Sequence, residues 1–157
     1  MILIALLGQS AQVVMTHGRF RATASKTVTS RLISLVEDDE AVRNSLANLL
    51  NSAGLTVESF ASAEEFLSSA RADMRSCLIL DVKLPRMSGI ELQQLLLSKE
   101  DPVPIIFITA NAANNLRIQA LRNGALAFFY KPFNAETLLT FVHLAVTRSE
   151  ITLADCQ

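Results

Sequence analysis

The chain has 157 residues, of which 50% are hydrophobic and 18% are charged. A chain of this length is expected to form one domain, which excludes a two-domain enzyme, and its apolar content excludes an intrinsically disordered protein. The net charge of −1 is the sum of +4 before Glu37 and −5 from Glu37 onward, so the body of the chain is mildly acidic and lacks the basic surface expected for direct binding of nucleic acid.

The first 30 residues differ in composition from the rest, because they contain basic residues and no acid. We expect residues 1–30 to form a flexible extension, or to include sequence upstream of a true translation start at Met15. Residues 1–7 are apolar but fall far short of the ~20 residues that span a bilayer, and no basic residue precedes them as in a secretory signal. Because Cys77 and Cys156 are too few for a disulfide framework, we expect a cytoplasmic protein with no membrane segment.

Short apolar runs alternate with helix-period segments after residue 30, a pattern typical of a parallel sheet wrapped by helices. The five predicted strands are residues 32–36, 56–60, 77–80, 105–108 and 126–130. We therefore expect an α/β domain at residues 31–149, followed by a short C-terminal tail at residues 150–157.

Apolar spacing and capping patterns predict five helices between and after these strands. The first ends at Gly54 and has on one face Val42, Leu46, Leu49, Leu50 and Ala53. The second and third begin at Ser62 and Ser88, each followed three residues later by Glu, which is the pattern of a capping box. The fourth ends at Gly124, and the fifth follows Asn134.

Polar side chains follow four of the predicted strands. Glu37 and Asp38 follow the first strand, Asp81 the third, Thr109 the fourth and Lys131 the fifth. In an open α/β sheet, ligands bind beyond the carboxyl ends of the strands, so the carboxylates of Glu37, Asp38 and Asp81 converge if the first and third strands are neighbours.

The chemistry of this group points to phosphoryl transfer. Three carboxylates repel one another unless a cation neutralises them, and Mg²⁺ suits oxygen ligands without His or Cys. A transferred phosphoryl group needs a positive charge and a hydrogen-bond donor, which Lys131 and Thr109 supply. The sequence therefore predicts phosphoryl chemistry on a carboxylate.

Four segments carry a resemblance to a known family: LISLVEDDEAVR (32–43), LILDVKLPRMSGIEL (78–92), IIFITA (105–110) and GALAFFYKPF (124–133). In this order they resemble the CheY-like receiver domain of bacterial two-component response regulators, and most of all its FixJ-type branch. The resemblance covers about residues 31–148. It implies a flavodoxin-like three-layer sandwich, with a five-stranded parallel sheet in the order 2-1-3-4-5 and five helices.

The resemblance also implies a role for each site residue. Asp81 would accept a phosphoryl group. Mg²⁺ would be bound by Asp81, by Asp38 directly, by Glu37 through water and by the backbone carbonyl of Lys83. Lys131 would contact the phosphoryl group, and Pro132 would follow a cis peptide bond. Asp39 lies one position past the acidic pair and is left out of the site.

The signalling step implied by the resemblance is a change in packing. Thr109 would move to the phosphoryl group, and Phe128 would turn inward into the space that Thr109 leaves. The phosphodonor would be a sensor histidine kinase or a histidine phosphotransfer protein. The surface of the fourth helix, fifth strand and fifth helix would form a phosphorylation-dependent homodimer or bind an effector. The output that this surface switches would be transcription regulation.

Two alternatives remain open at this point. One is a degenerate receiver that acts only through protein contacts. The other is an aspartate-nucleophile phosphatase of the haloacid dehalogenase type, which is less favoured because that family has a second acid two residues after the nucleophile, where this chain has Lys83.

Overall fold

A computed structural model describes residues 12–16, 19–23, 31–71, 74–111 and 113–155. Its main feature is a five-stranded parallel sheet in the order β4-β3-β5-β6-β7. The strands are β3 (Leu32–Val36), β4 (Thr56–Phe60), β5 (Arg75–Asp81), β6 (Ile105–Thr109) and β7 (Ala127–Tyr130). Counted along the domain, this is the order 2-1-3-4-5, so the predicted topology is confirmed.

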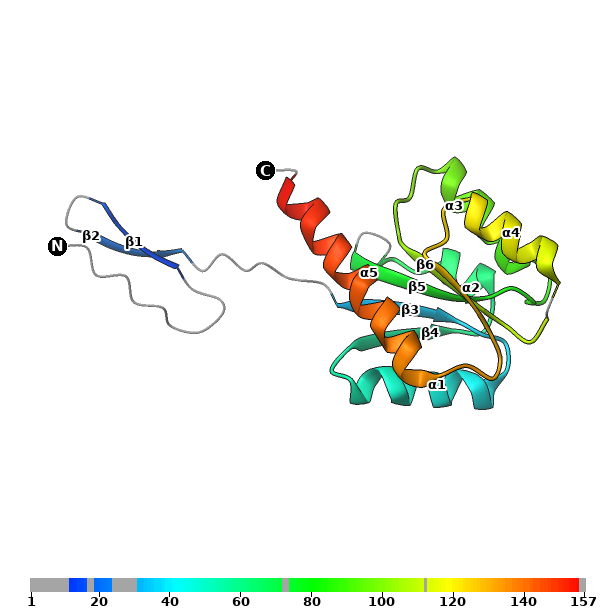
Figure 1. Cartoon of the computed structure of the whole chain (residues 1–157). Coiled ribbons are helices and arrows are strands. Elements are labelled where there is room, and N and C mark those ends of the chain that lie inside the picture. The colour runs from blue at the N-terminus through cyan, green and yellow to red at the C-terminus, as the bar shows by residue number, and fades with distance from the viewer. Residues whose placement is uncertain (1–11, 17–18, 24–30, 72–73, 112, 156–157) are drawn as a thin grey trace.

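Helices cover both faces of this sheet (Figure 1). They are α1 (Glu40–Ser52), α2 (Ala63–Leu67), α3 (Gly89–Ser98), α4 (Asn114–Arg122) and α5 (Ala135–Asp155). Because side chains alternate along a strand, the sheet divides the core in two. Ile33 and Ile79 face a cluster that includes residues of α1 and α5, whereas Leu78 and Leu80 face a cluster formed with α2, α3 and α4.

The strands read as continuous apolar runs because both faces are covered. All five residues of β3 and all five of β6 are buried. β5 is longer than predicted, since it begins at Arg75 and includes Asp81. The edge strand β4 is the least buried and the most polar of the five, as expected for a strand with one neighbour.

Side chains cap the starts of four helices, and at α5 the cap is Asn134, which accepts from the amide of Thr137. Ser88 and Glu91 form the predicted reciprocal capping box of α3. Ser62 caps α2 by accepting from the amide of Glu65, but the Glu65 carboxylate accepts from the amide of Ala61, so the predicted box is only half present there. Asp39 caps α1 by accepting from the amide of Val42.

The two ends of the chain bear on the predicted domain limits. Helix α5 continues to Asp155, through residues assigned above to a tail. Within the predicted extension, β1 (Gln12–Thr16) and β2 (Arg19–Thr23) pair as antiparallel strands, which the sequence analysis did not anticipate. The rest of residues 1–30 lies outside the described residues. No helix in the described ranges is both long and apolar enough to cross a membrane.

Candidate functional site

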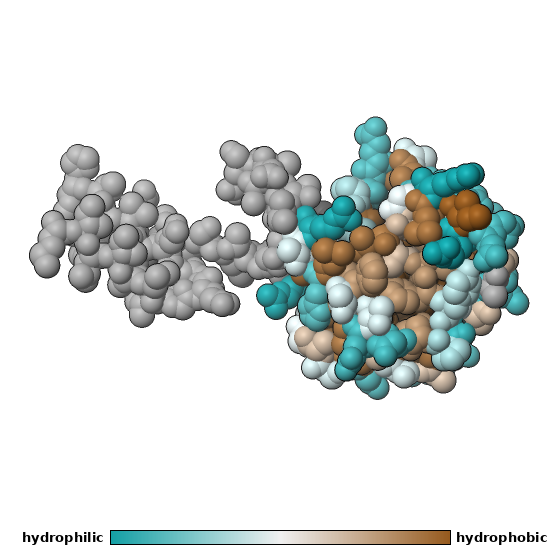
Figure 2. All heavy atoms as spheres, viewed as in Figure 1, coloured by the Kyte–Doolittle hydropathy of each residue, from teal (hydrophilic) through white to brown (hydrophobic). Residues whose placement is uncertain are grey.

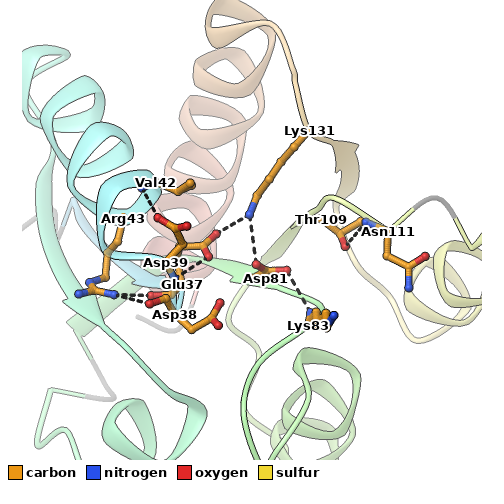
Figure 3. Close-up of polar contacts among 10 residues, drawn as sticks. All are labelled: Glu37, Asp38, Asp39, Val42, Arg43, Asp81, Lys83, Thr109, Asn111 and Lys131. Carbon is orange, nitrogen blue, oxygen red and sulfur yellow. Dashed lines mark hydrogen bonds and ion pairs between the residues drawn. The ribbon is translucent and has the colours of Figure 1, made fainter.

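The polar residues that follow the strands meet at one edge of the sheet. β3 and β5 are adjacent, with Val36 paired to Leu80, so the carboxyl groups of Glu37 and Asp81 emerge side by side. Thr109 ends β6, and Lys131 follows β7. Figure 3 shows the side chains of Glu37, Asp38, Asp81 and Lys131 directed toward a common space. The predicted convergence is therefore present.

Lys131 connects two of the three carboxylates. Its ammonium group lies 2.6 Å from Oε2 of Glu37 and 3.1 Å from Oδ2 of Asp81 (Figure 3). Both acids are buried, whereas the lysine side chain is 20% exposed. The pairing satisfies charges that would otherwise be costly to remove from water. The peptide bond between Lys131 and Pro132 is cis.

Burial dominates the ionisation of Glu37. Removal from water raises the pKa of Glu37 from 4.5 to about 7, the hydrogen bond from Lys131 opposes this rise, and the nearby charge of Asp81 adds to it. For Lys131, burial lowers the pKa, but the hydrogen bond to Glu37 and the charge of Asp81 outweigh burial and raise it overall. The site is thus short of positive charge, because one lysine faces more than one carboxylate.

The acidic run after β3 divides into residues with different tasks. The carboxylate of Asp39 caps α1 by accepting from the amide of Val42 at 3.0 Å. Asp38 is exposed, and its carboxylate belongs to a cluster with those of Glu37 and Asp81, in which one oxygen of each lies within 4.8 Å of the others. The amide of Asp39 donates to Oε1 of Glu37 at 3.1 Å, which holds the buried carboxylate in place.

The donor set of this cluster fits Mg²⁺. All three side chains offer carboxylate oxygens, the ligands that this hard cation prefers. Two oxygens bound to opposite sides of one Mg²⁺ lie about 4.2 Å apart, so a group within 4.8 Å needs little movement, or one bridging water, to share an ion.

Asp81 is held by the loop that follows it. Its Oδ1 accepts from the amide of Lys83 at 3.0 Å. Gly89, at the start of α3, lies so close to the end of β5 that an added Cβ would overlap the carbonyl oxygen of Asp81, and its amide donates to the carbonyl of Val82 at 2.9 Å. A glycine is required here so that α3 can pack against the strand that carries Asp81.

The two predicted switch residues lie on the α3 and α4 side of the sheet. Thr109 is buried, and its hydroxyl accepts from the amide of Asn111 at 3.0 Å, rather than contacting Asp81 or Lys131. The ring of Phe128 is half-buried and contacts the rings of Phe107 and Tyr130, with centroids 5.8 and 5.4 Å apart.

Arg43 is a neighbour of the site that the sequence reasoning missed. Its Nη1 donates to the carbonyl of Glu37 at 2.7 Å and to that of Asp38 at 3.3 Å. The available signal was that Arg43 is the one basic residue of α1 and lies within a turn of its start.

Known proteins resemble this chain over the same region. Residues 33–143 match the family described as response regulator receiver domain. Nodulation protein W of Bradyrhizobium diazoefficiens is 42% identical over 120 residues, which cover 76% of this chain and 53% of that protein. Transcriptional regulatory protein FixJ of the same organism is 34% identical over 118 residues, which cover 75% of this chain and 58% of that protein. The chain thus spans little more than half the length of these curated relatives.

Solved structures agree with this match. The low-resolution structure of response regulator StyR superimposes with a TM-score of 0.73 at 40% identity and covers 79% of this chain and 63% of that chain. The crystal structure titled FixJ-N gives a TM-score of 0.66 at 33% identity over 74% of this chain and 93% of that one. The chain belongs to the family of response regulator receiver domains, and its homologues are two-component response regulators such as FixJ, a class of generally non-enzymatic signal transducers.

Proposed function

We propose that this chain is the phosphoacceptor of a two-component system and that Asp81 takes its phosphoryl group from the phosphohistidine of a sensor histidine kinase or a histidine phosphotransfer protein. The observation that carries the proposal is the way Asp81 is held. Its two oxygens accept from different donors, the amide of Lys83 and the ammonium group of Lys131. A carboxylate fixed in this way at an open strand end is oriented for attack on phosphorus.

Phosphoryl transfer needs only Asp81 and the phosphohistidine, and hydrolysis needs only water in addition. A carboxylate oxygen of Asp81 attacks the phosphorus, a P–O bond forms as the P–N bond to imidazole breaks, and the imidazole leaves with that electron pair. In hydrolysis, a water oxygen attacks the phosphorus, the P–O bond to Asp81 breaks, and inorganic phosphate leaves. The chain in this proposal catalyses only reactions of its own Asp81 and has no separate substrate.

Mg²⁺ would be held by Glu37, Asp38 and Asp81, with the backbone carbonyl of Lys83 as a further ligand. The bound ion would supply positive charge for the oxygens of the phosphoryl group. Lys131 supplies a second positive charge, because its ammonium group already lies 3.1 Å from an Asp81 oxygen and can exchange Glu37 for a phosphoryl oxygen.

Thr109 and Phe128 would carry the signal away from Asp81. The Thr109 hydroxyl accepts one hydrogen bond from Asn111, so its own proton remains available for a phosphoryl oxygen. Movement of Thr109 toward the phosphoryl group leaves space beside β7, and the half-buried ring of Phe128 is placed to enter it. Such a change is a two-state repacking biased by one local charge.

The surface of α4, β7 and α5 is the proposed output surface. Figure 2 shows apolar residues gathered on the face where α4 and α5 flank the sheet. α4 exposes Ile118 and Leu121, and α5 exposes Leu144. We propose that a second phosphorylated copy or an effector covers this surface. Because the homologue FixJ is described as a transcriptional regulatory protein, we propose that the output is transcription regulation. We also propose that this mildly acidic domain is cytoplasmic and does not itself contact nucleic acid.

Phosphorylation by a small phosphodonor tests this function. The protein is incubated with acetyl phosphate and Mg²⁺, and intact mass spectrometry counts the phosphoryl groups. We expect one group on the wild type and none on Asp81→Asn. Asp39→Asn is the matched control, because it removes a neighbouring carboxylate while Asn keeps the cap of α1, and it should be phosphorylated like the wild type.

The same assay separates the alternatives. An unchanged phosphorylation level in Asp81→Asn would refute the site. A wild type that accepts no phosphoryl group from acetyl phosphate or from any histidine kinase of the source cell would point instead to a receiver that acts by protein contacts alone.

A further inference from the structure

Arg43 binds the acidic loop from the side opposite Lys131 (Figure 3). Its guanidinium group donates to two successive main-chain carbonyls, those of Glu37 at 2.7 Å and Asp38 at 3.3 Å. The side chain is half-buried. Among the ion pairs of the described residues none includes Arg43, so these carbonyls are its partners rather than the carboxylates a few residues away.

This contact fixes the direction of the loop. Carbonyl groups that point toward Arg43 leave the two side chains to project on the other side, where Asp81 lies (Figure 3). A planar guanidinium can serve two acceptors with a fixed geometry, which a lysine ammonium on a flexible stem does less well. Hydrogen bonds with a charged donor are also stronger than those between neutral groups.

The two acids depend on this contact to different degrees. The carboxylate of Glu37 is buried and held by the Asp39 amide and by Lys131. Asp38 is exposed, and no hydrogen bond to its carboxylate is found among the described residues. The position of that carboxylate therefore follows from the position of its backbone, which Arg43 holds.

We propose that Arg43 is a positioning residue for a divalent cation: by holding the carbonyls of Glu37 and Asp38, it directs their carboxylates toward Asp81 and strengthens binding of the ion. The inference rests on the metal site of the proposed function. It adds a residue that contacts neither the ion nor the phosphoryl group.

The proposal and simple electrostatics predict opposite changes in Mg²⁺ affinity when Arg43 is replaced by a neutral residue. Arg43 carries a positive charge close to a site for a cation, so its charge alone repels the ion. If charge were its only influence, a neutral replacement would tighten Mg²⁺ binding. If Arg43 acts by orientation, the same replacement weakens Mg²⁺ binding, because residues that orient the ligands of a metal commonly contribute about tenfold or more to its affinity.

Isothermal titration calorimetry with MgCl₂ on the unphosphorylated protein shows whether the Kd for Mg²⁺ rises or falls. We expect Arg43→Met to raise the Kd for Mg²⁺ about tenfold and Arg43→Lys to raise it less, since Lys keeps the charge and a donor nitrogen but lacks the planar guanidinium. Arg122→Met is the matched control. Arg122 is exposed at the far end of α4 from the strand edge that holds Asp81, and its replacement should leave the Kd unchanged.

Thermal unfolding without Mg²⁺ separates orientation from stability. A variant that unfolds at a lower temperature but binds Mg²⁺ with the wild-type Kd overturns the proposal, as does tighter binding by Arg43→Met. If Arg43→Met does not fold, Arg43→Lys decides, and a wild-type Kd for it overturns the proposal. A wild type that binds no Mg²⁺ instead overturns the proposed function, and this inference with it.

Discussion

Replacing Glu37 by Gln should make the metal-free protein more stable above neutral pH while removing part of the proposed metal site. Burial raises the pKa of Glu37 from 4.5 to about 7. Each pKa unit corresponds to about 1.4 kcal/mol, so the ionised side chain opposes folding by about 3 kcal/mol relative to the unfolded chain. This is an upper value for the gain, since Glu37→Gln also removes one partner of Lys131.

The sign of the effect follows from where the proton is held. Between pH 4.5 and about 7 the folded protein keeps the Glu37 proton and the unfolded chain has lost it. The Glu37 contribution to the free energy of unfolding therefore falls as the pH rises through this window, and it is constant above about pH 7. In Glu37→Gln this fall is absent.

Urea unfolding in EDTA at a series of pH values measures the difference. Relative to the wild type, Glu37→Gln should gain up to about 3 kcal/mol between pH 4.5 and 8. Glu91→Gln is the control, because hydrogen bonds from the Ser88 backbone and hydroxyl lower the pKa of Glu91. Its contribution to stability is therefore constant above pH 4.5 and changes with pH only below it, so Glu91→Gln should keep the wild-type slope between pH 4.5 and 7. Equal slopes for wild type and Glu37→Gln between pH 4.5 and 7 would refute the reasoning.

Two further predictions concern residues that frame the site. Asp39→Ala removes the cap of α1, an oxygen 3.0 Å from the amide of Val42, and should lower the free energy of unfolding by about 1 kcal/mol with the extent of phosphorylation by acetyl phosphate unchanged; a loss of phosphorylation in folded protein would show that Asp39 belongs to the site. Gly89→Ala should cost about 3 kcal/mol, because the new Cβ overlaps the carbonyl of Asp81. Gly124→Ala should cost only about 1–2 kcal/mol, because its φ of 92° is strained for Ala but nothing lies within 4 Å; urea unfolding compares the two, and an equal or smaller cost at Gly89 contradicts the steric argument.

The fold was predictable because local and global signals agree. The apolar runs that become β3 and β6 are buried on both faces, and Ser88 begins α3 with the capping box visible in the sequence. The acids, the threonine and the lysine that follow the predicted strands indicated where the site would form. Periodicity and short-range motifs carry this information without knowledge of long-range contacts.

The contacts of the site were less predictable because they depend on distances across the sheet. Lys131 lies 94 positions from Glu37 and still forms the shortest ion pair described. The interaction of Arg43 with carbonyls has no side-chain signature, since any residue offers a carbonyl. The incomplete capping box at Ser62 was equally hard to predict, because the local bend of the backbone decides whether the Glu65 carboxylate accepts from the amide of Ser62 or from that of Ala61.

The position of Lys131 between Glu37 and Asp81 would make uptake of the proposed cation an ion exchange. Without a divalent ion, the ammonium group serves as the built-in counter-ion of the buried acids. A cation that engages Glu37 must displace this counter-ion, so its apparent affinity is lower than the same carboxylates would give without the lysine. The displaced ammonium group remains tethered at the end of β7 and becomes available to a second, anionic ligand. In the proposed function, loading of the metal and readiness for the phosphoryl group would thereby be coupled through one side chain.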